Sequence, residues 1–164
     1  MSQPVRVLFV CTGNICRSPT AHAVLLKLIR ERGLEGVLEC DSAGTQAYHE
    51  GDGADPRSCA TGERHGLDFS FHRARKVVRR DLEAFDWILA MDRSHLDWLQ
   101  DISYPGQRAK IELFLSALSD STWSEMPDPY YGGGRGFETV LGLCQKGCEA
   151  WLPIWLPQLA ESAQ

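Results

Sequence analysis

The chain of 164 residues has no hydrophobic run long enough to cross a membrane and no excess of basic residues. Its 17 Lys and Arg against 22 Asp and Glu give a net charge of −5, which argues against nucleic acid as a partner. The first residues lack the basic-then-apolar order of a secretory signal peptide. We therefore expect a cytoplasmic protein that has no membrane partner.

Repeats, linkers and low-complexity tracts are also missing, so the length and the 43% hydrophobic content favour a single domain spanning residues 1–164. A chain of this size needs no disulfides. Cys144 and Cys148 share a predicted helical stripe with apolar residues, which indicates small buried side chains, and Cys40 is interpreted in the same way. No histidine–cysteine group has zinc-like spacing, so we expect neither a metal nor a cofactor.

Short apolar runs alternate with helical patterns along the chain. We predict strands at 5–10, 37–42, 87–91 and 110–114, and helices at 19–32, 55–65, after 92 and from 136, with a short helical piece at 81–85. A long polar loop at 119–135 precedes the last helix, whose end Pro153 and Pro157 should make irregular. This alternation predicts an α/β fold, a three-layer sandwich in which helices cover both faces of a four-stranded parallel sheet.

The loop after the first strand has the composition of an anion-binding site. It reads Cys11-Thr12-Gly13-Asn14-Ile15-Cys16-Arg17-Ser18-Pro19. Ser18 before Pro19 is typical of a helix N-cap with proline at the first helical position. A loop that enters a helix N-terminus points backbone N–H groups and positive charge at a bound anion, and Arg17 can hold two of its oxygens. The same field would favour the thiolate form of Cys11.

A cysteine, five residues, an arginine and a serine are typical of cysteine-dependent phosphatases. The loop closely resembles that of the low-molecular-weight protein tyrosine phosphatases, and the resemblance extends to the final helix. It implies a flavodoxin-like fold, protein-tyrosine-phosphatase activity on phosphotyrosine-containing proteins, and phosphate or vanadate as ligands. It also implies that Cys11 is the nucleophile, that Arg17 binds the phosphoryl group, and that the rest of the phosphate-binding loop is formed by Thr12, Gly13, Asn14, Ile15, Cys16 and Ser18.

The segment around Asp128 gains meaning only together with Cys11. Alone, its Asp-Pro pair indicates an ordinary turn. Phosphoryl transfer to a cysteine must expel a tyrosine oxygen, however, and this leaving group needs a proton from an acid. By the resemblance, Asp128 is that general acid and later the base. Tyr130 and Tyr131 then match paired tyrosines on the wall of the substrate cleft, and Tyr48 matches another aromatic position there.

The resemblance also implies a hydrogen-bond network that holds the loop, formed by Asn14, Ser18, Ser42 and His72. The alternative for Ser42 is an ordinary turn at the end of a strand. Cys16 could form a reversible disulfide with Cys11 by family analogy, and loop packing is an equally weighted alternative.

Three residues depart from the family pattern. Lys76 stands where the family usually has glutamine. The contacts around the hydrogen-bond network are therefore not implied by the resemblance, whereas the chemistry is. His22 stands where a glutamate is common and His95 where asparagine is usual. Because both lie on predicted helices, we expect them to alter the surface or the substrate preference and to leave the chemistry intact.

Other functions are compatible with parts of this sequence pattern. Arsenate reductases share this loop but need cysteines in the middle of the chain, and none lies between Cys59 and Cys144. Protein-arginine phosphatases carry a threonine in place of Ile15 and lack the paired tyrosines, so we keep them as the alternative. A non-catalytic phosphate-binding or redox-sensing module would need no acid at Asp128. We therefore predict hydrolysis of phosphotyrosine through a cysteinyl-phosphate intermediate.

Overall fold

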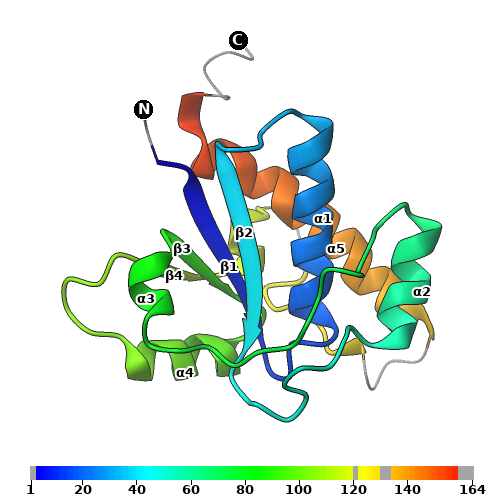
Figure 1. Cartoon of the computed structure of the whole chain (residues 1–164), viewed down its shortest axis with the longest axis horizontal. Coiled ribbons are helices and arrows are strands. Elements are labelled where there is room, and N and C mark those ends of the chain that lie inside the picture. The colour runs from blue at the N-terminus through cyan, green and yellow to red at the C-terminus, as the bar shows by residue number, and fades with distance from the viewer. Residues whose placement is uncertain (1–2, 120–121, 130–133, 159–164) are drawn as a thin grey trace.

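A central parallel sheet organises the computed structural model, which describes residues 3–119, 122–129 and 134–158. The strand order is β2-β1-β3-β4, and the four strands are β1 (Val5–Cys11), β2 (Leu38–Gly44), β3 (Trp87–Ala90) and β4 (Lys110–Leu113). Every neighbouring pair is parallel, and Cys11 lies opposite Gly44 at the carboxyl edge. The predicted four-stranded parallel sheet is confirmed (Figure 1).

Helices cover both faces of this sheet, as Figure 1 shows. They are α1 (Arg17–Glu31), α2 (Pro56–Arg64), α3 (Asp81–Ala84), α4 (Arg93–Ile102), the 3₁₀ helix η1 (Phe114–Ala117) and α5 (Gly134–Trp155). Helices α1 and α5 pack together on one face, with α2 against α5, while α3 and α4 lie on the other face. The predicted three-layer arrangement is therefore confirmed.

The core follows from the alternation of side chains along β1. Val7 and Phe9 face the α1–α5 layer, and Leu8 and Val10 face the α3–α4 layer. All four are fully buried, so the strand is covered on both sides as its apolar run predicts.

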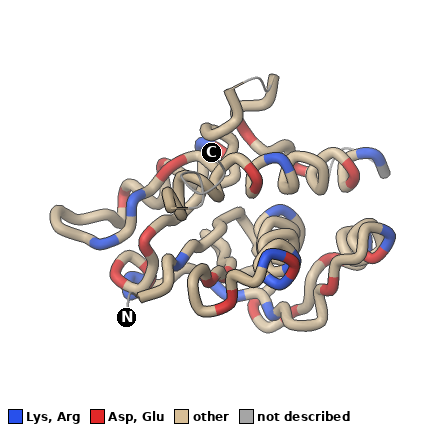
Figure 2. The backbone as a smooth tube through the Cα atoms, turned by 90° about the horizontal axis from the view of Figure 1, so that it is seen from above, with Lys and Arg blue, Asp and Glu red and all other residues tan. Residues whose placement is uncertain are grey.

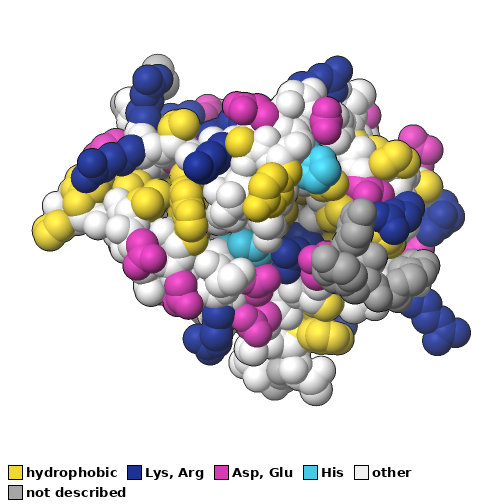
Figure 3. All heavy atoms as spheres, turned by 90° about the horizontal axis from the view of Figure 1, so that it is seen from below, with side chains coloured by type: hydrophobic (Ala, Val, Ile, Leu, Met, Phe, Trp, Pro, Cys, Tyr) yellow, Lys and Arg dark blue, Asp and Glu magenta, His cyan; other side chains and the backbone are white. Residues whose placement is uncertain are grey.

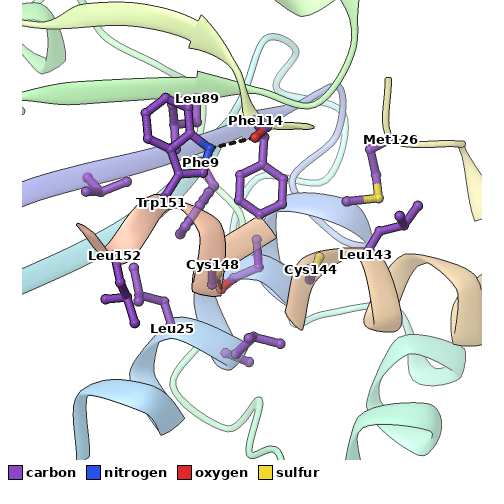
Figure 4. Close-up of a cluster of buried hydrophobic side chains, with 14 of the residues drawn as sticks. Phe9, Leu25, Leu89, Phe114, Met126, Leu143, Cys144, Cys148, Trp151 and Leu152 are labelled. Atoms are coloured by element: carbon purple, nitrogen blue, oxygen red, sulfur yellow. Dashed lines mark hydrogen bonds between the residues drawn. The ribbon is translucent and has the colours of Figure 1, made fainter. Parts of the chain in front are cut away.

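The α5 side of the core is closed by aromatic side chains (Figure 4). The Phe9 and Phe114 rings meet edge to face, with centroids 5.4 Å apart. The indole Nε1 of Trp151 donates to the Phe114 carbonyl oxygen at 2.6 Å. Cys144 and Cys148 are buried in this cluster, which confirms their prediction as small apolar side chains.

The end of β2 and the start of α5 are among the element boundaries that differ from the predictions. Strand β2 continues two residues further, because Ala43 and Gly44 pair with the end of β1. Helix α5 begins at Gly134 and runs through Pro153 to Trp155. A proline there removes one backbone hydrogen bond, and the burial of Trp151 and Trp155 on either side of it keeps the last turn in place.

Charged residues are spread over the whole fold. Figure 2 shows basic and acidic residues interspersed along the helices and loops of both layers. Among the described helices, none combines the length and the apolar character that a membrane span requires. Within the same residues, no three His, Cys, Asp or Glu side chains are grouped so as to hold a metal ion.

Packing of α5 against η1 depends on one glycine. A Cβ atom at Gly147 would lie 2.4 Å from the ring of Phe114, whereas one at Gly142 on the same helix would meet nothing within 4 Å. We expect Gly147→Ala to lower the free energy of unfolding by about 1–2 kcal/mol, because overpacking outweighs the gain in helix propensity. Gly142→Ala should raise it by up to about 1 kcal/mol. Urea unfolding of both variants checks this, and equal effects would contradict it.

Candidate active site

The carboxyl edge of the sheet carries a cavity of about 260 Å³ beside the predicted loop. Its lining residues come from the loop, from the segment after β2 and from the segment before α5: Cys11, Thr12, Gly13, Ile15, Cys16, Arg17, Tyr48, His49 and Asp128. Seen from this edge, histidine, basic and acidic side chains lie close together near the middle of the face (Figure 3). The structure thus brings the predicted nucleophile, the predicted arginine and the predicted acid to one place.

Asn14 shapes the loop. It has a φ of 58°, the left-handed conformation that asparagine tolerates better than most residues. Its Oδ1 accepts from the Arg75 backbone N–H at 3.0 Å, so its Nδ2 is free to donate to Ser18 Oγ at 2.9 Å and to Ser42 Oγ at 3.0 Å. Its carbonyl oxygen accepts from His72 Nε2 at 2.6 Å. Three of these four bonds join Asn14 to Ser18, Ser42 and His72, the residues that the family resemblance had grouped.

Ser18 is part of this network and does not cap α1, so the prediction of an N-cap is wrong. Helix α1 begins two residues earlier than predicted, at Arg17 after Cys16, and no side chain caps it. The Ser18 hydroxyl is fully buried and lies 2.9 Å from Cys11 Sγ. Because the hydroxyl oxygen already accepts from Asn14, its proton is available to the sulfur atom. This buried bond outweighs the local preference of serine for a cap.

The loop offers a set of donors to an anion. None of the backbone N–H groups of residues 12–18 donates to an acceptor within the described part of the chain. The partial positive charge at the start of α1 adds to these donors. The geometry therefore suits a tetrahedral oxyanion directly above Cys11.

Arg17 is held rigidly beside the loop. Its Nη1 donates to Asp92 Oδ2 at 2.8 Å and to the Met126 carbonyl oxygen at 3.1 Å. Its Nη2 lies 3.9 Å from Asp128 Oδ2. The side chain is buried although it is charged, so the Asp92 carboxylate compensates a charge that would otherwise be costly. The sequence pattern predicted only that a helix begins after Asp92, although the position of this residue after β3 at the same edge was a usable signal.

His95 binds the loop from α4 and is not a surface residue. Its Nδ1 accepts from the Asp92 backbone N–H at 3.1 Å, which completes a capping box with the Asp92 carboxylate. Its Nε2 lies 2.8 Å from Thr12 Oγ1. Burial, followed by the charge of Arg17, lowers the pKa of His95 to about 4. The ring is therefore neutral near pH 7.

His22 is likewise buried, on the opposite side of the network. Its Nδ1 lies 3.2 Å from Ser42 Oγ, and its ring meets Phe71 edge to face. Burial lowers the pKa of His22 to about 4, and it also lowers the pKa of His72. The expectation that His22 and His95 alter the surface is wrong, because both helices turn these residues towards the loop.

The remaining predicted residues lie as follows. Tyr48 is exposed at the cavity mouth, and Asp128 lies at its rim with part of its carboxylate accessible. Lys76 lies outside the cavity lining, with its Nζ 5.9 Å from the centre of the Trp98 ring. The predicted cleft residues Tyr130 and Tyr131 fall outside the residues that the structure describes.

Two further residues complete the cavity wall. His49, to which sequence reasoning gave no role, lies against the loop, since a Cβ atom at Gly13 would be 3.0 Å from its ring. Cys16 is buried under the loop, and burial together with the Asp55 carboxylate raises its pKa to about 12. Its thiol is therefore protonated at neutral pH, and a disulfide with Cys11 stays a prediction.

A cysteine and an arginine around an anion-binding loop, on a parallel sheet with helices on both faces, place the protein among the cysteine-dependent phosphatases. Residues 6–164 match the family described as low molecular weight phosphotyrosine protein phosphatase. The chain belongs to this family and is a protein-tyrosine-phosphatase by that relationship.

Three relatives illustrate the similarity. The low molecular weight protein-tyrosine-phosphatase YfkJ of Bacillus subtilis is 39% identical over 90% of this chain and 94% of its own. The crystal structure of a protein tyrosine phosphatase from Entamoeba histolytica, with Hepes in its active site, has a TM-score of 0.86 and 38% identity, covering 98% of this chain and 99% of that chain. A Drosophila arginine phosphatase has a TM-score of 0.86 and 33% identity, covering 92% and 97%.

Two of the buried histidines, His22 and His95, should make stability depend on pH. Their pKa values of about 4 lie below the ordinary 6.5, so between these values the unfolded chain binds more protons than the folded one. The free energy of unfolding should therefore fall as the pH drops from about 7 to about 5, by on the order of 2 kcal/mol for each histidine. Urea titrations should show a flatter dependence for His22→Gln and for His95→Gln. Variants that keep the full wild-type dependence would contradict this.

Proposed function

We propose that the enzyme hydrolyses phosphotyrosine in proteins through a cysteinyl-phosphate intermediate. The observation that supports this most directly is the single cavity lined by Cys11, Arg17 and Asp128. Inorganic phosphate and vanadate are the small ligands that such a cavity suits, since both are tetrahedral oxyanions in solution.

The first step transfers the phosphoryl group to sulfur. The Cys11 thiolate, which the Ser18 hydroxyl stabilises by donation at 2.9 Å, attacks phosphorus as the bond to the tyrosine oxygen breaks. Arg17 and the loop N–H groups hold the equatorial oxygens, where negative charge lies in the transition state. Asp128 gives its proton to the leaving oxygen, so that tyrosine departs as a neutral phenol.

The second step regenerates the enzyme. A water molecule attacks the phosphorus of the cysteinyl-phosphate, and the sulfur–phosphorus bond breaks to release the Cys11 thiolate. The Asp128 carboxylate takes the proton that the water loses. Inorganic phosphate leaves, and Asp128 is again protonated for the next cycle.

The cavity favours an aryl phosphate over phosphoarginine. Ile15 contributes an apolar, half-buried side chain to the lining, and the exposed Tyr48 can stack on a substrate ring. Arginine phosphatase activity remains the second candidate, because a relative with that activity has the same fold. The residue that separates the two candidates within the loop is Ile15.

Substitution of the nucleophile and of the acid tests the mechanism. Cys11→Ser should abolish hydrolysis of p-nitrophenyl phosphate, because a serine hydroxyl is far less nucleophilic than a thiolate. Asp128→Asn should lower the turnover of a phosphotyrosine peptide by about 10²- to 10⁴-fold. Its effect on p-nitrophenyl phosphate should be smaller, since p-nitrophenolate leaves more readily without a proton.

Cys59→Ser is the matched control, because this half-buried cysteine lies in α2 outside the cavity lining. It should retain wild-type rates. Wild-type-like turnover in Cys11→Ser, or equal losses on both substrates in Asp128→Asn, would rule out the roles proposed for these residues.

The role of Ile15 in substrate choice can be tested with threonine and valine, two residues that are equal in size to each other. Ile15→Thr should raise the rate on phosphoarginine relative to phosphotyrosine, because its hydroxyl can hydrogen-bond a guanidinium group. Ile15→Val has nearly the same shape without the hydroxyl, so it should leave that ratio close to the wild-type value. The measurement is kcat/KM on paired peptides that differ only in the phosphorylated residue. A wild-type preference for phosphoarginine would overturn the proposed substrate.

A further inference from the structure

The contact between Thr12 and His95 joins a residue of the cavity lining to α4 and has no part in the mechanism described above. Thr12 lines the cavity together with Cys11 and Arg17. Within the described residues, its hydroxyl has a single hydrogen-bond partner, His95 Nε2 at 2.8 Å. Its backbone is fixed independently, because its carbonyl oxygen accepts from the Gln46 N–H at 3.0 Å.

The direction of this bond follows from the other nitrogen of the ring. His95 Nδ1 lies 3.1 Å from the Asp92 backbone nitrogen and 3.2 Å from Asp92 Oδ1. Asp92 Oδ1 already accepts from the backbone N–H groups of Ser94 and His95, whereas the Asp92 backbone N–H can only donate, so we assign Nδ1 as an acceptor without a proton. A neutral imidazole then carries its single proton on Nε2. His95 therefore donates to Thr12 Oγ1, and the hydroxyl proton of Thr12 must point to a different acceptor.

The charges around His95 support a neutral ring. Arg17 faces it from α1 and disfavours a second positive charge, whereas the Asp92 and Asp128 carboxylates favour one. Burial is the largest influence, and the side chain is almost completely enclosed. The ring is held from α4 by Asp92, so its Nε2–H has a fixed direction towards Thr12.

We propose that His95 is a positioning residue that turns the Thr12 hydroxyl into an additional hydrogen-bond donor for the phosphoryl group. This inference rests on the proposed function, because it needs an oxyanion bound above Cys11. The Thr12 oxygen is already occupied as an acceptor, so the hydroxyl proton is directed to the cavity and reaches a phosphoryl oxygen when substrate or phosphate is bound. The loop then binds the anion with one side-chain hydroxyl besides Arg17 and the backbone N–H groups.

Binding of inorganic phosphate to the full chain tests the proposal, by isothermal titration or by competition with p-nitrophenyl phosphate. Thr12→Val keeps the shape of the side chain and removes the hydroxyl. Its dissociation constant should rise about tenfold, the expected loss of one hydrogen bond to a charged ligand. Thr12→Ser retains the hydroxyl and should stay within about threefold of the wild type.

The role of His95 is tested by a double-mutant cycle. His95→Ala should also weaken phosphate binding, and adding Thr12→Val to it should cost less than about twofold more, because the hydroxyl is no longer directed. Unchanged phosphate affinity in Thr12→Val, or the same tenfold loss in the His95→Ala background, would overturn the proposal. A wild-type enzyme that binds no phosphate would instead refute the proposed function itself.

A second measurement needs no variant, in case His95→Ala does not fold. Nitrogen NMR of the wild type near pH 7 should show His95 with an unprotonated Nδ1 and a protonated Nε2. A proton on Nδ1, in either the other tautomer or the imidazolium, would contradict the assigned direction of the bond. If His95 only capped α4, the double-mutant cycle would show no coupling between His95 and Thr12 in phosphate binding.

Discussion

The left-handed conformation of Asn14 is the constraint on which the site depends. Both polar atoms of its side-chain amide are hydrogen-bonded, since Oδ1 accepts from the Arg75 N–H and Nδ2 donates to Ser18 and Ser42. These bonds belong to a buried network in which each polar side chain has a hydrogen-bond partner, and the network ends at Cys11 Sγ. Loss of any member would leave a buried polar group unpaired, which is costly. The thiol is thus presented by a rigid loop that several segments of the chain hold in place.

A second set of contacts holds the positively charged Arg17 side chain beside the Cys11 sulfur atom. Asp92 both caps α4 and accepts from Arg17, so it ties the start of this helix to the arginine. His95 connects the same helix to Thr12 in the loop. His22 stands on the other side of the network as a second neutral imidazole. His22 and His95 therefore both lie next to the residues that hold the loop, and burial lowers the pKa of each to about 4.

The local parts of this architecture were predictable from the sequence, and the long-range parts were not. The strand, loop and helix around Arg17 form one continuous segment, so their pattern alone indicated an anion site. Asp128 could be assigned only through the family resemblance, because its own segment reads as an ordinary turn. Ser18 was assigned to a cap because helix-capping propensity does not register the hydrogen bonds that its hydroxyl makes with Cys11 and Asn14 in the folded loop. The burial of His95 and the pairing of Asp92 with the arginine depend on how α4 meets the loop, which no local pattern encodes.

The central claim is that Cys11 carries the phosphoryl group between the two steps. Rapid acid quenching of the enzyme during turnover of a phosphotyrosine peptide, followed by mass spectrometry of its peptides, tests this most directly. The account predicts one phosphoryl group on the peptide that contains Cys11, present during turnover and gone once substrate is exhausted. Turnover without any phosphorylated cysteine peptide, or with the phosphoryl group on a different residue, would contradict it.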